Sequence, residues 1–324
     1  MRRHPAFRSV RHLTRALASV LIASLAPLVV GAAPAAQAAP PRTWTVLAGS
    51  QSDDMALQGM SFLPANIYID AGDTVRWTAN SAEIHTVTFL ATGQSLGSLQ
   101  PFDPAKPNEL LRRGGSSYNG HSYYNSGILT TAPNSGLPAV KSYSLTFPRT
   151  GTYTYYCLVH GTAMKGTVHV RAAGTPYPYS QRDYNRQARE REERILDDGM
   201  DLWQQARDDA GRHTVIAGAD DGTAMVMRFV RATVVIRTGQ RVTFVNNGMG
   251  APHTVTFGKE PANPFAKVGN PRNFRGGQLN SGLLAPHSSF TVTFTKAGTF
   301  TYVCALHDYM GMVGKVVVRD PSGD

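Results

Sequence analysis

The stretch Gly151-Thr-Tyr-Thr-Tyr-Tyr-Cys157-Leu-Val-His160 recurs later in the chain as Gly298-Thr-Phe-Thr-Tyr-Val-Cys304-Ala-Leu-His307. In both copies small polar residues alternate with aromatic ones up to the cysteine, which is the period-two pattern of a β-strand. An internal repeat of this length indicates that each half of the chain forms the same structural unit. The repeat therefore predicts the domain organisation before any single motif is interpreted.

The similarity extends upstream of this stretch. The segment from Met60 to Trp77 parallels that from Met227 to Phe244, and His85-Thr-Val-Thr-Phe89 matches His253-Thr-Val-Thr-Phe257. Short alternating segments separated by glycine turns, with no amphipathic helices between them, favour an all-β fold with one antiparallel β-sandwich per copy. We predict two tandem domains, at residues 42–171 and 214–319. The first copy is longer at residues 92–124 and 130–141, and we expect surface loops there because Gly, Ser, Pro and Asn are frequent.

The segment 172–213 between the two copies has a different composition. Residues 176–213 carry seven Arg and nine Asp or Glu, so most sides of this segment are solvated. A weak apolar stripe at helical spacing is formed by Tyr184, Ala188, Ile195, Leu202, Trp203 and Ala206. These features predict a charged linker helix resting on one domain; the alternative is a flexible charged tether.

The N-terminus has the pattern of an export signal. Five Arg and no acidic residue lie within residues 1–15, a short apolar run covers residues 16–30, and Ala36-Gln37-Ala38 resembles a cleavage site. We predict that residues 1–38 are a signal peptide and that the protein is exported to the periplasm or the medium. An uncleaved N-terminal anchor is the alternative. After Pro40 no apolar run reaches the roughly 18 residues of a membrane span, so none is predicted after cleavage.

Composition narrows the function classes. The chain is 42% hydrophobic and 17% charged, which excludes a disordered or fibrous protein. Its net charge of +10 falls to +5 when the five Arg of the predicted signal are removed, so no nucleic-acid partner is predicted. Residues 214–324 hold 11 Lys or Arg against 6 Asp or Glu, a net +5 that favours an acidic surface on a partner.

The candidate chemistry lies where the two copies agree most closely. The first copy has His85 and then Cys157, His160 and Met164; the second has His253 and then Cys304, His307 and Met312. Two imidazoles, one thiolate and one thioether are the donor set of a type 1 copper site, because soft sulfur stabilises Cu(I) and imidazole suits both oxidation states. Zinc fits less well, since it prefers several thiolates and rarely takes a methionine. We predict two copper ions, Cu(I)/Cu(II), per chain and no other cofactor.

Both halves resemble the plastocyanin/azurin family of blue copper proteins, the cupredoxins. The second copy is the closer match, through Asn246-Asn-Gly-Met-Gly-Ala-Pro252-His253 and the run from Cys304 to Lys315. The resemblance implies a Greek-key β-sandwich, the ligands His253, Cys304, His307 and Met312, and an electron-transfer role. It also implies that electrons enter through an apolar patch at the exposed edge of His160 or His307.

The first copy departs from the family pattern in two ways. Glu83-Ile84 replaces the Ala-Pro that precedes His253 in the second copy, and the spacing from His160 to Met164 is one residue shorter. The shorter loop makes the axial geometry at Met164 an open question. In the second copy Met310 is a rival to Met312, although alignment of Met312-Val-Gly with Met164-Lys-Gly favours Met312.

Smaller departures concern the surroundings of the thiolates. Val159 and Leu306 stand where plastocyanins often have proline, which restores a backbone N–H that we consider as a donor to sulfur. Thr86 and Thr254 stand where plastocyanins often have Asn, so the groups around the ligands are expected to differ.

The cysteines and the remaining histidines and methionines also allow other interpretations. A disulfide between Cys157 and Cys304 would leave the repeated His and Met unexplained. The remaining His121, His169, His213 and His287 show no paired pattern and are predicted to be ordinary surface or loop residues. Met55, Met60, Met225 and Met227 are interpreted as core residues rather than a copper-transfer track.

The sequence supports electron transfer with a redox protein as partner. The alternatives are copper storage, delivery or resistance, which would use the same ligands, and a two-domain copper oxidoreductase like laccase or nitrite reductase. The oxidoreductase is disfavoured because the chain has no His-x-His pair for a trinuclear cluster. We therefore predict a non-enzymatic electron carrier with no catalytic residues.

Overall fold

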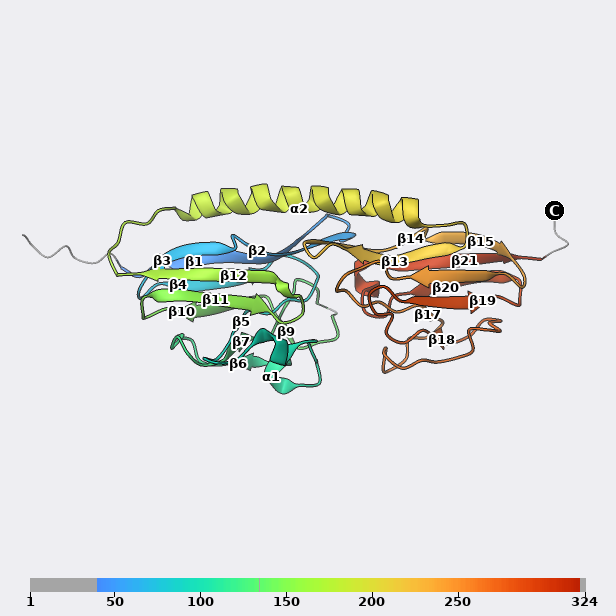
Figure 1. Cartoon of the computed structure of the whole chain (residues 1–324), viewed down its shortest axis with the longest axis horizontal. Helices are drawn as coiled ribbons and strands as arrows, with labels where there is room; N and C mark the ends of the chain where they lie inside the picture. The colour runs from blue at the N-terminus through green and yellow to red at the C-terminus, as the bar shows by residue number, and fades with distance from the viewer. Residues whose placement is uncertain (1–39, 134, 321–324) are drawn as a thin grey trace, which may run out of the picture. The chain divides into compact units, whose positions relative to one another are not determined.

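A computed structural model describes residues 40–133 and 135–320. The predicted signal peptide, residues 1–38, lies outside the described residues. Figure 1 shows an arrangement dominated by strands, which confirms the all-β fold class.

Each copy contributes nine equivalent strands in the same order. Those of the first copy are β1 (Thr43–Gln51), β2 (Leu57–Leu63), β3 (Asn66–Asp70), β4 (Thr74–Ala79), β5 (Thr88–Phe89), β7 (Tyr124–Ser126), β10 (Ser142–Thr146), β11 (Gly151–Cys157) and β12 (Gly161–Arg171). Those of the second are β13 (Thr214–Asp220), β14 (Ala224–Val230), β15 (Thr233–Arg237), β16 (Arg241–Val245), β17 (Thr256–Phe257), β18 (Leu279–Asn280), β19 (Ser289–Thr293), β20 (Gly298–Val303) and β21 (Val313–Arg319).

The remaining short elements lie mostly in the longer connections of the first copy. They are η1 (Leu96–Leu99), α1 (Pro107–Leu110), β6 (Arg112–Arg113), β8 (Ile128–Leu129) and β9 (Ala139–Val140), while the second copy has η2 (Asp308–Met310). The expected surface loops of the first copy therefore carry short helical turns and small strands.

The sandwich cores form where the alternating strands turn their apolar faces inward. In β4 the buried positions are Val75, Trp77 and Ala79, and Trp77 meets Tyr155 of β11 edge-on at a ring distance of 5.2 Å. The second copy repeats this contact between Phe244 and Tyr302 at 5.0 Å. The alternation was visible in the sequence because every second side chain of a strand points into the core, and the aromatic rings lie at such positions.

The strand pairing is mixed rather than purely antiparallel as predicted. β1 pairs with β4 and β3 with β12 in parallel, and β13–β16 and β15–β21 repeat this arrangement in the second copy. The chain crosses between the two layers of the sandwich before it returns beside an earlier strand, so the returning strand runs parallel to it. Sequence alternation does not distinguish parallel from antiparallel neighbours.

One sheet runs through both copies. Its order is β10-β4-β1-β2-β14-β13-β16-β19, so β2 of the first copy pairs with β14 of the second. The pairs are Leu57 with Val226, Gln58 with Met225, and Gly59 with Ala224, all antiparallel. Separate sheets complete each sandwich, with the orders β3-β12-β11-β5-β7-β6 and β15-β21-β20-β17-β18, and β8-β9 form a small pair.

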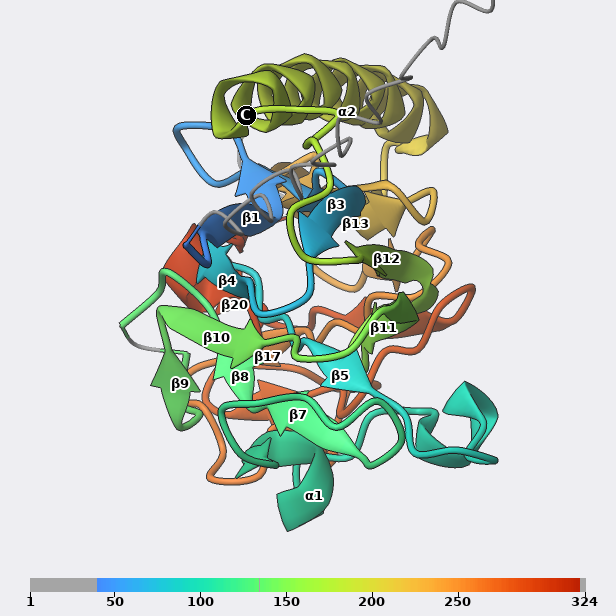
Figure 2. The same cartoon turned by 90° about the vertical axis from the view of Figure 1, so that its left-hand side faces the viewer.

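The linker forms one long helix, α2 (Gln181–Asp209), as predicted. It begins with a capping box in which the Ser180 side chain accepts from the Asp183 N–H. Its buried residues are Tyr184, Ala188, Ile195, Gly199 and Ala206, and Leu202 and Trp203 are partly buried. The helix does not rest on one domain only: it packs against β2 and also against β14 and β13 (Figure 1), and Figure 2 shows it on one side of the strands.

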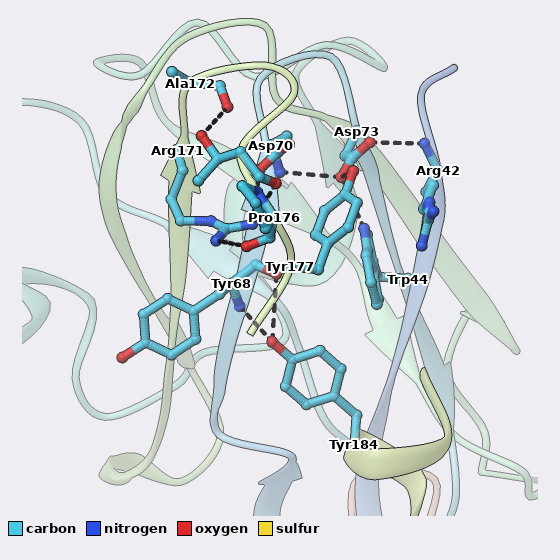
Figure 3. Close-up of polar contacts among 11 residues, drawn as sticks. Arg42, Trp44, Tyr68, Asp70, Asp73, Arg171, Ala172, Pro176, Tyr177 and Tyr184 are labelled. Atoms are coloured by element: carbon cyan, nitrogen blue, oxygen red, sulfur yellow. Dashed lines mark hydrogen bonds and ion pairs between the residues drawn. The ribbon is translucent and has the colours of Figure 1, made fainter. Parts of the chain in front are cut away.

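The segment before α2 is tied to the first sandwich by a buried carboxylate. Asp73 accepts hydrogen bonds from the Tyr177 hydroxyl at 2.9 Å, the Trp44 indole at 2.8 Å and the Arg42 backbone N–H at 2.7 Å (Figure 3). The Tyr184 hydroxyl accepts from the backbone N–H of Tyr68 at 2.8 Å. These contacts fix where the helix begins.

Candidate metal centres

In the first site the three predicted donors meet at one end of the first sandwich. Cys157 ends β11 and His160 follows it directly, while His85 lies in the loop between β4 and β5. The Cys157 Sγ lies 3.3 Å from His160 Nδ1, and one donor atom from each of the three residues falls within 4.8 Å of the others. A bridge between His85 and Leu129 fixes the loop that carries the first histidine.

The second site has the same construction. Cys304 follows β20, and its Sγ lies 3.4 Å from His307 Nδ1 and 3.7 Å from His253 Nδ1. The two Nδ1 atoms are 3.2 Å apart. A bridge between His253 and Leu284 corresponds to the bridge at His85. The structure therefore brings together His85, Cys157 and His160 in one group and His253, Cys304 and His307 in another.

Polar groups left without a partner indicate what these sites hold. His85 Nδ1 is buried and has no hydrogen-bond partner within the described residues, whereas its Nε2 lies 2.9 Å from the Ser81 hydroxyl. A buried nitrogen without a partner is costly unless a ligand uses its lone pair. Two imidazole nitrogens beside one thiolate fit a copper ion, and both groups fit one such ion each.

Two glycines make room for the first histidine of each site. Gly49 lies beside His85 and Gly218 beside His253, and a side chain at either position would overlap the imidazole Nε2. Both glycines have positive φ, +80° and +75°, in the bulged strands β1 and β13. The bulge and the missing side chain together set the histidine position.

Backbone N–H groups surround the thiolates, but not those expected from the sequence. The N–H groups of Thr86 and Thr254, each next to the first histidine, donate to the Sγ of Cys157 and Cys304 at 3.4 Å. Across the described residues, neither Val159 nor Leu306 donates to sulfur through its backbone. The backbone N–H groups that Val159 and Leu306 have in place of proline are therefore not the donors to sulfur.

The threonine hydroxyls join the two ligand loops of each site. Thr86 Oγ1 accepts from the N–H of Leu158 at 2.8 Å, and Thr254 Oγ1 accepts from the N–H of Ala305 at 2.7 Å. Each hydroxyl also contacts a second threonine, Thr88 at 3.1 Å or Thr256 at 3.0 Å. The residue after the first histidine thus holds the residue after the cysteine in place.

The charges within each site support binding of a cation. Burial opposes ionisation of Cys157, but the nearby histidines outweigh it and lower the pKa of the thiol well below its usual value; Cys304 behaves in the same way. Burial disfavours the charged form of His160, but the Cys157 thiolate raises the pKa of this histidine to about 10. The thiolate, which is the form that binds metals, is therefore favoured at both sites.

The predicted axial methionines are both fully buried. Met164 lies in the first core and Met312 in the second. The Met312 carbonyl accepts from the Cys304 N–H at 3.0 Å, and its own N–H donates to the His307 carbonyl at 3.3 Å. The rival Met310 packs instead into the core of the first copy. The Met310 N–H also donates to the His307 carbonyl, at 3.1 Å, so it is the packing of Met312 in the same core as Cys304 that favours Met312 over Met310 as a neighbour of the second site.

In the described part of the chain, the ligand histidines expected to present an exposed edge are largely covered. The His160 side chain is 7% exposed, and His307 is also 7% exposed. The expectation that either ring presents a broadly exposed edge is therefore not met, whereas electron entry near these histidines stays a prediction. Glu83 of the same copy contacts His160, and beside His307 the segment with Tyr309 contacts Ala82 of the first copy.

Sequence reasoning missed one functional candidate, Glu83. It is 4% exposed, and its Oε1 lies 3.7 Å from His160 Nε2. Burial opposes its ionisation, but the contact with His160 and the charges of His307, His160 and His85 lower the pKa of Glu83 to about 2. The signal was present in the sequence, since Glu83-Ile84 is where the first copy departs from the second.

The other histidines and methionines occupy ordinary positions. His121 and His287 are exposed, and His169 stacks on Tyr68 at a ring distance of 4.4 Å. Within residues 40–133 and 135–320, the His, Cys, Asp and Glu groups close enough to hold a metal are the two described above. Met60, Met225 and Met227 are buried in the first core and Met55 packs against it, as core residues do. None of the described helices has the length and apolar character needed to cross a membrane.

Comparison with known proteins agrees with this geometry. The model of the family described as "Copper binding proteins, plastocyanin/azurin family" matches residues 50–171 and 214–319. The chain is 40% identical to a chloroplastic plastocyanin of Chlamydomonas reinhardtii over 106 residues, which cover 33% of this chain and 66% of that protein. It is 35% identical to plastocyanin A'/A'' of Nicotiana tabacum over 105 residues, which cover 32% of this chain and 98% of that protein. Solved structures of amicyanin variants are also similar, one at 24% identity and a TM-score of 0.23, covering 33% of this chain and 80% of that chain.

Proposed function

The chain belongs to the plastocyanin/azurin family of copper-binding proteins, and from this membership we propose that it is an exported electron carrier with one type 1 copper site in each copy. The proposed domains are residues 42–171 and 214–319, joined by the linker 172–213, and residues 1–38 are the proposed signal peptide. The proposed ligands are His85, Cys157, His160 and Met164 in the first domain and His253, Cys304, His307 and Met312 in the second.

One observation carries this proposal: each copy holds a compact, buried group of two imidazoles and one thiolate. When bound, copper supplies a one-electron Cu(II)/Cu(I) couple. The residues of the chain hold the donor atoms in a fixed arrangement, since Thr86 and Thr254 tie the ligand loops together and Gly49 and Gly218 accept the imidazoles closely. A site with little freedom to rearrange favours electron transfer.

The same burial argues against the alternative of copper delivery. Transfer of copper to another protein requires incoming ligands to reach the metal, and the rings of His160 and His307 are almost fully covered. We therefore propose that a redox protein receives and supplies electrons at the surface above these loops without removing the metal. The net +5 on residues 214–324 favours an acidic surface on that partner.

Repeated redox cycling in the presence of a Cu(I) chelator tests the proposal. The copper-loaded protein is reduced with ascorbate and reoxidised several times while free Cu(I) is captured. Electron transfer predicts that the visible absorption returns after each cycle and that the chelator stays largely empty. Rapid loss of Cu(I) to the chelator would favour copper storage or delivery instead.

A further inference from the structure

The two copies meet through an interface with approximate twofold symmetry. In the β2–β14 pair, Gln58 lies opposite Met225, and these two residues occupy equivalent positions in the repeat. On either side, Leu57 pairs with Val226 and Gly59 with Ala224, so each copy presents the same strand to the other. An interface of this kind is the intrachain counterpart of an isologous dimer contact. It places equivalent parts of the two copies on either side of the same axis.

The ligand loops of the two sites meet beside this interface. Tyr309, which lies two residues after ligand His307, donates from its hydroxyl to the Ala82 carbonyl at 3.4 Å. Tyr309 packs against the first core, and the neighbouring Met310 is buried within it. Arg228 strengthens the junction, since its guanidinium donates to the Met310 carbonyl at 2.7 Å and the Asp54 carbonyl at 2.6 Å. The backbone at Ala82 therefore contacts the segment that follows ligand His307 in the second site.

Glu83 breaks the symmetry at this junction. Its equivalent in the second copy is Ala251, so the Glu83 carboxylate has no counterpart at that position of the repeat. The Glu83 Oε1 lies 3.7 Å from His160 Nε2, and its Oε2 has no hydrogen-bond partner among the described residues. Its backbone N–H donates to Gln58 Oε1 at 3.2 Å, which fixes it beside the pseudosymmetry axis.

The backbone next to Glu83 also adjoins the second site, because the preceding Ala82 carbonyl accepts from Tyr309, which lies two residues after ligand His307. A buried negative charge next to ligand histidines favours the more positive oxidation state of the metal they hold.

We propose that Glu83 is a positioning residue shared by the two copper sites. Its carboxylate contacts His160, lies one residue from the Ala82–Tyr309 contact with the second site, and lowers the reduction potentials of both. The inference rests on the proposed function, because it requires copper at both sites. The carboxylate orients the His160 ring through Nε2 and stabilises Cu(II) in each copy by its charge. The Glu83 carboxylate, at the junction of the two copies, thus favours loss of an electron from either site.

Single-site proteins test this proposal in the full chain. In Cys304→Ser only the first site keeps its thiolate, and in Cys157→Ser only the second does. Glu83→Gln is introduced into each background and the midpoint potential is measured by spectroelectrochemical titration. We expect the Cu(I):Cu(II) ratio at a fixed ambient potential to rise about tenfold at each site, which is about 59 mV for one electron. Glu109→Gln, which removes another buried carboxylate paired with Lys106, is the matched control and is expected to leave both potentials unchanged.

The outcomes separate this inference from the proposed function. A shift at the first site alone, with the second unchanged, would overturn the shared role. Equal shifts in the Glu109→Gln control would attribute the effect to general destabilisation. Glu83→Asp keeps the charge, so it is expected to give potentials closer to the parent at both sites, and it serves if Glu83→Gln folds poorly. Absence of type 1 absorption from both single-site parents would contradict the proposed function itself.

Discussion

Gly218 lies so close to the imidazole of His253 that a Cβ on the glycine would overlap the ring nitrogen Nε2. Gly49 and His85 have the same relationship in the first copy. Each glycine sits at the bulge of an inner strand, so the strand that begins each sandwich also determines where the first ligand lies. The conserved geometry links the fold directly to the metal site.

Replacement of Gly218 by alanine is expected to displace His253 and weaken copper binding at the second site. The matched control is Gly222→Ala, because Gly222 has a similar φ of +87° but no atom within 4 Å of an added Cβ. Both variants carry the backbone strain of positive φ, of about 1–3 kcal/mol. Copper affinity by competition with a chelator distinguishes them: only Gly218→Ala is expected to bind copper more weakly. Equal affinities in the two variants would show that the close contact does not position the ligand.

Thr254→Val is expected to destabilise the second domain. The hydroxyl of the buried Thr254 accepts from the Ala305 N–H at 2.7 Å, and valine leaves this donor without a partner. A buried unpaired group costs about 1–3 kcal/mol. Chemical denaturation of the copper-free protein measures the loss. Thr254→Ser keeps the hydroxyl and should retain most of the stability, so an equal loss in both variants would point to packing rather than to the hydrogen bond.

The axial ligand of the second site is tested by replacing each of two neighbouring methionines, Met312 and Met310, with leucine. Met312→Leu removes the proposed thioether donor, so its electron paramagnetic resonance and visible spectra are expected to change. Met310→Leu alters a residue buried in the first core and should cost less than about 1.5 kcal/mol without a spectral change. The reverse pattern, with the spectrum altered only by Met310→Leu, would assign the axial position to Met310.

The linker helix is expected to contribute to the stability of the described chain. Ile195 is fully buried against the strands, so Ile195→Ala should lower the free energy of unfolding by about 2–5 kcal/mol. Met200 on the same helix is 57% exposed, and Met200→Ala should change it by less than about 0.5 kcal/mol. Thermal or urea unfolding compares the two. No difference between them would mean that the helix is a loosely attached tether.

The repeat predicted much of this structure because its signals are local. Alternation around Trp77 and Tyr155 marked the strands, and the paired Cys and His positions marked both metal sites. The apolar stripe of the linker predicted α2. The stripe omitted Gly199, which is buried and whose missing side chain leaves room for Leu57 close to the helix. These features depend on neighbours within a few residues of one another.

The features that the sequence did not predict depend on contacts between the copies. The pairing of Gln58 with Met225 joins the edge strands of the two copies. The sequence of an edge strand does not indicate which other strand it will pair with. One signal was available in the second copy: β14 is apolar at every position except Arg228 rather than alternating, as expected for a strand covered on both faces. The contact of Tyr309 with Ala82, near ligand His307, joins the copies in the same way.

The central claim is that each copy holds one type 1 copper through its own cysteine. Copper content and the intense thiolate-to-copper visible absorption, measured on the mature protein and on Cys157→Ser and Cys304→Ser, test it most directly. The account predicts two copper ions per chain, loss of one type 1 signal in each variant, and retention of the other. A copper-loaded protein without this absorption, or a single cysteine variant that abolishes both signals in a folded chain, would contradict it.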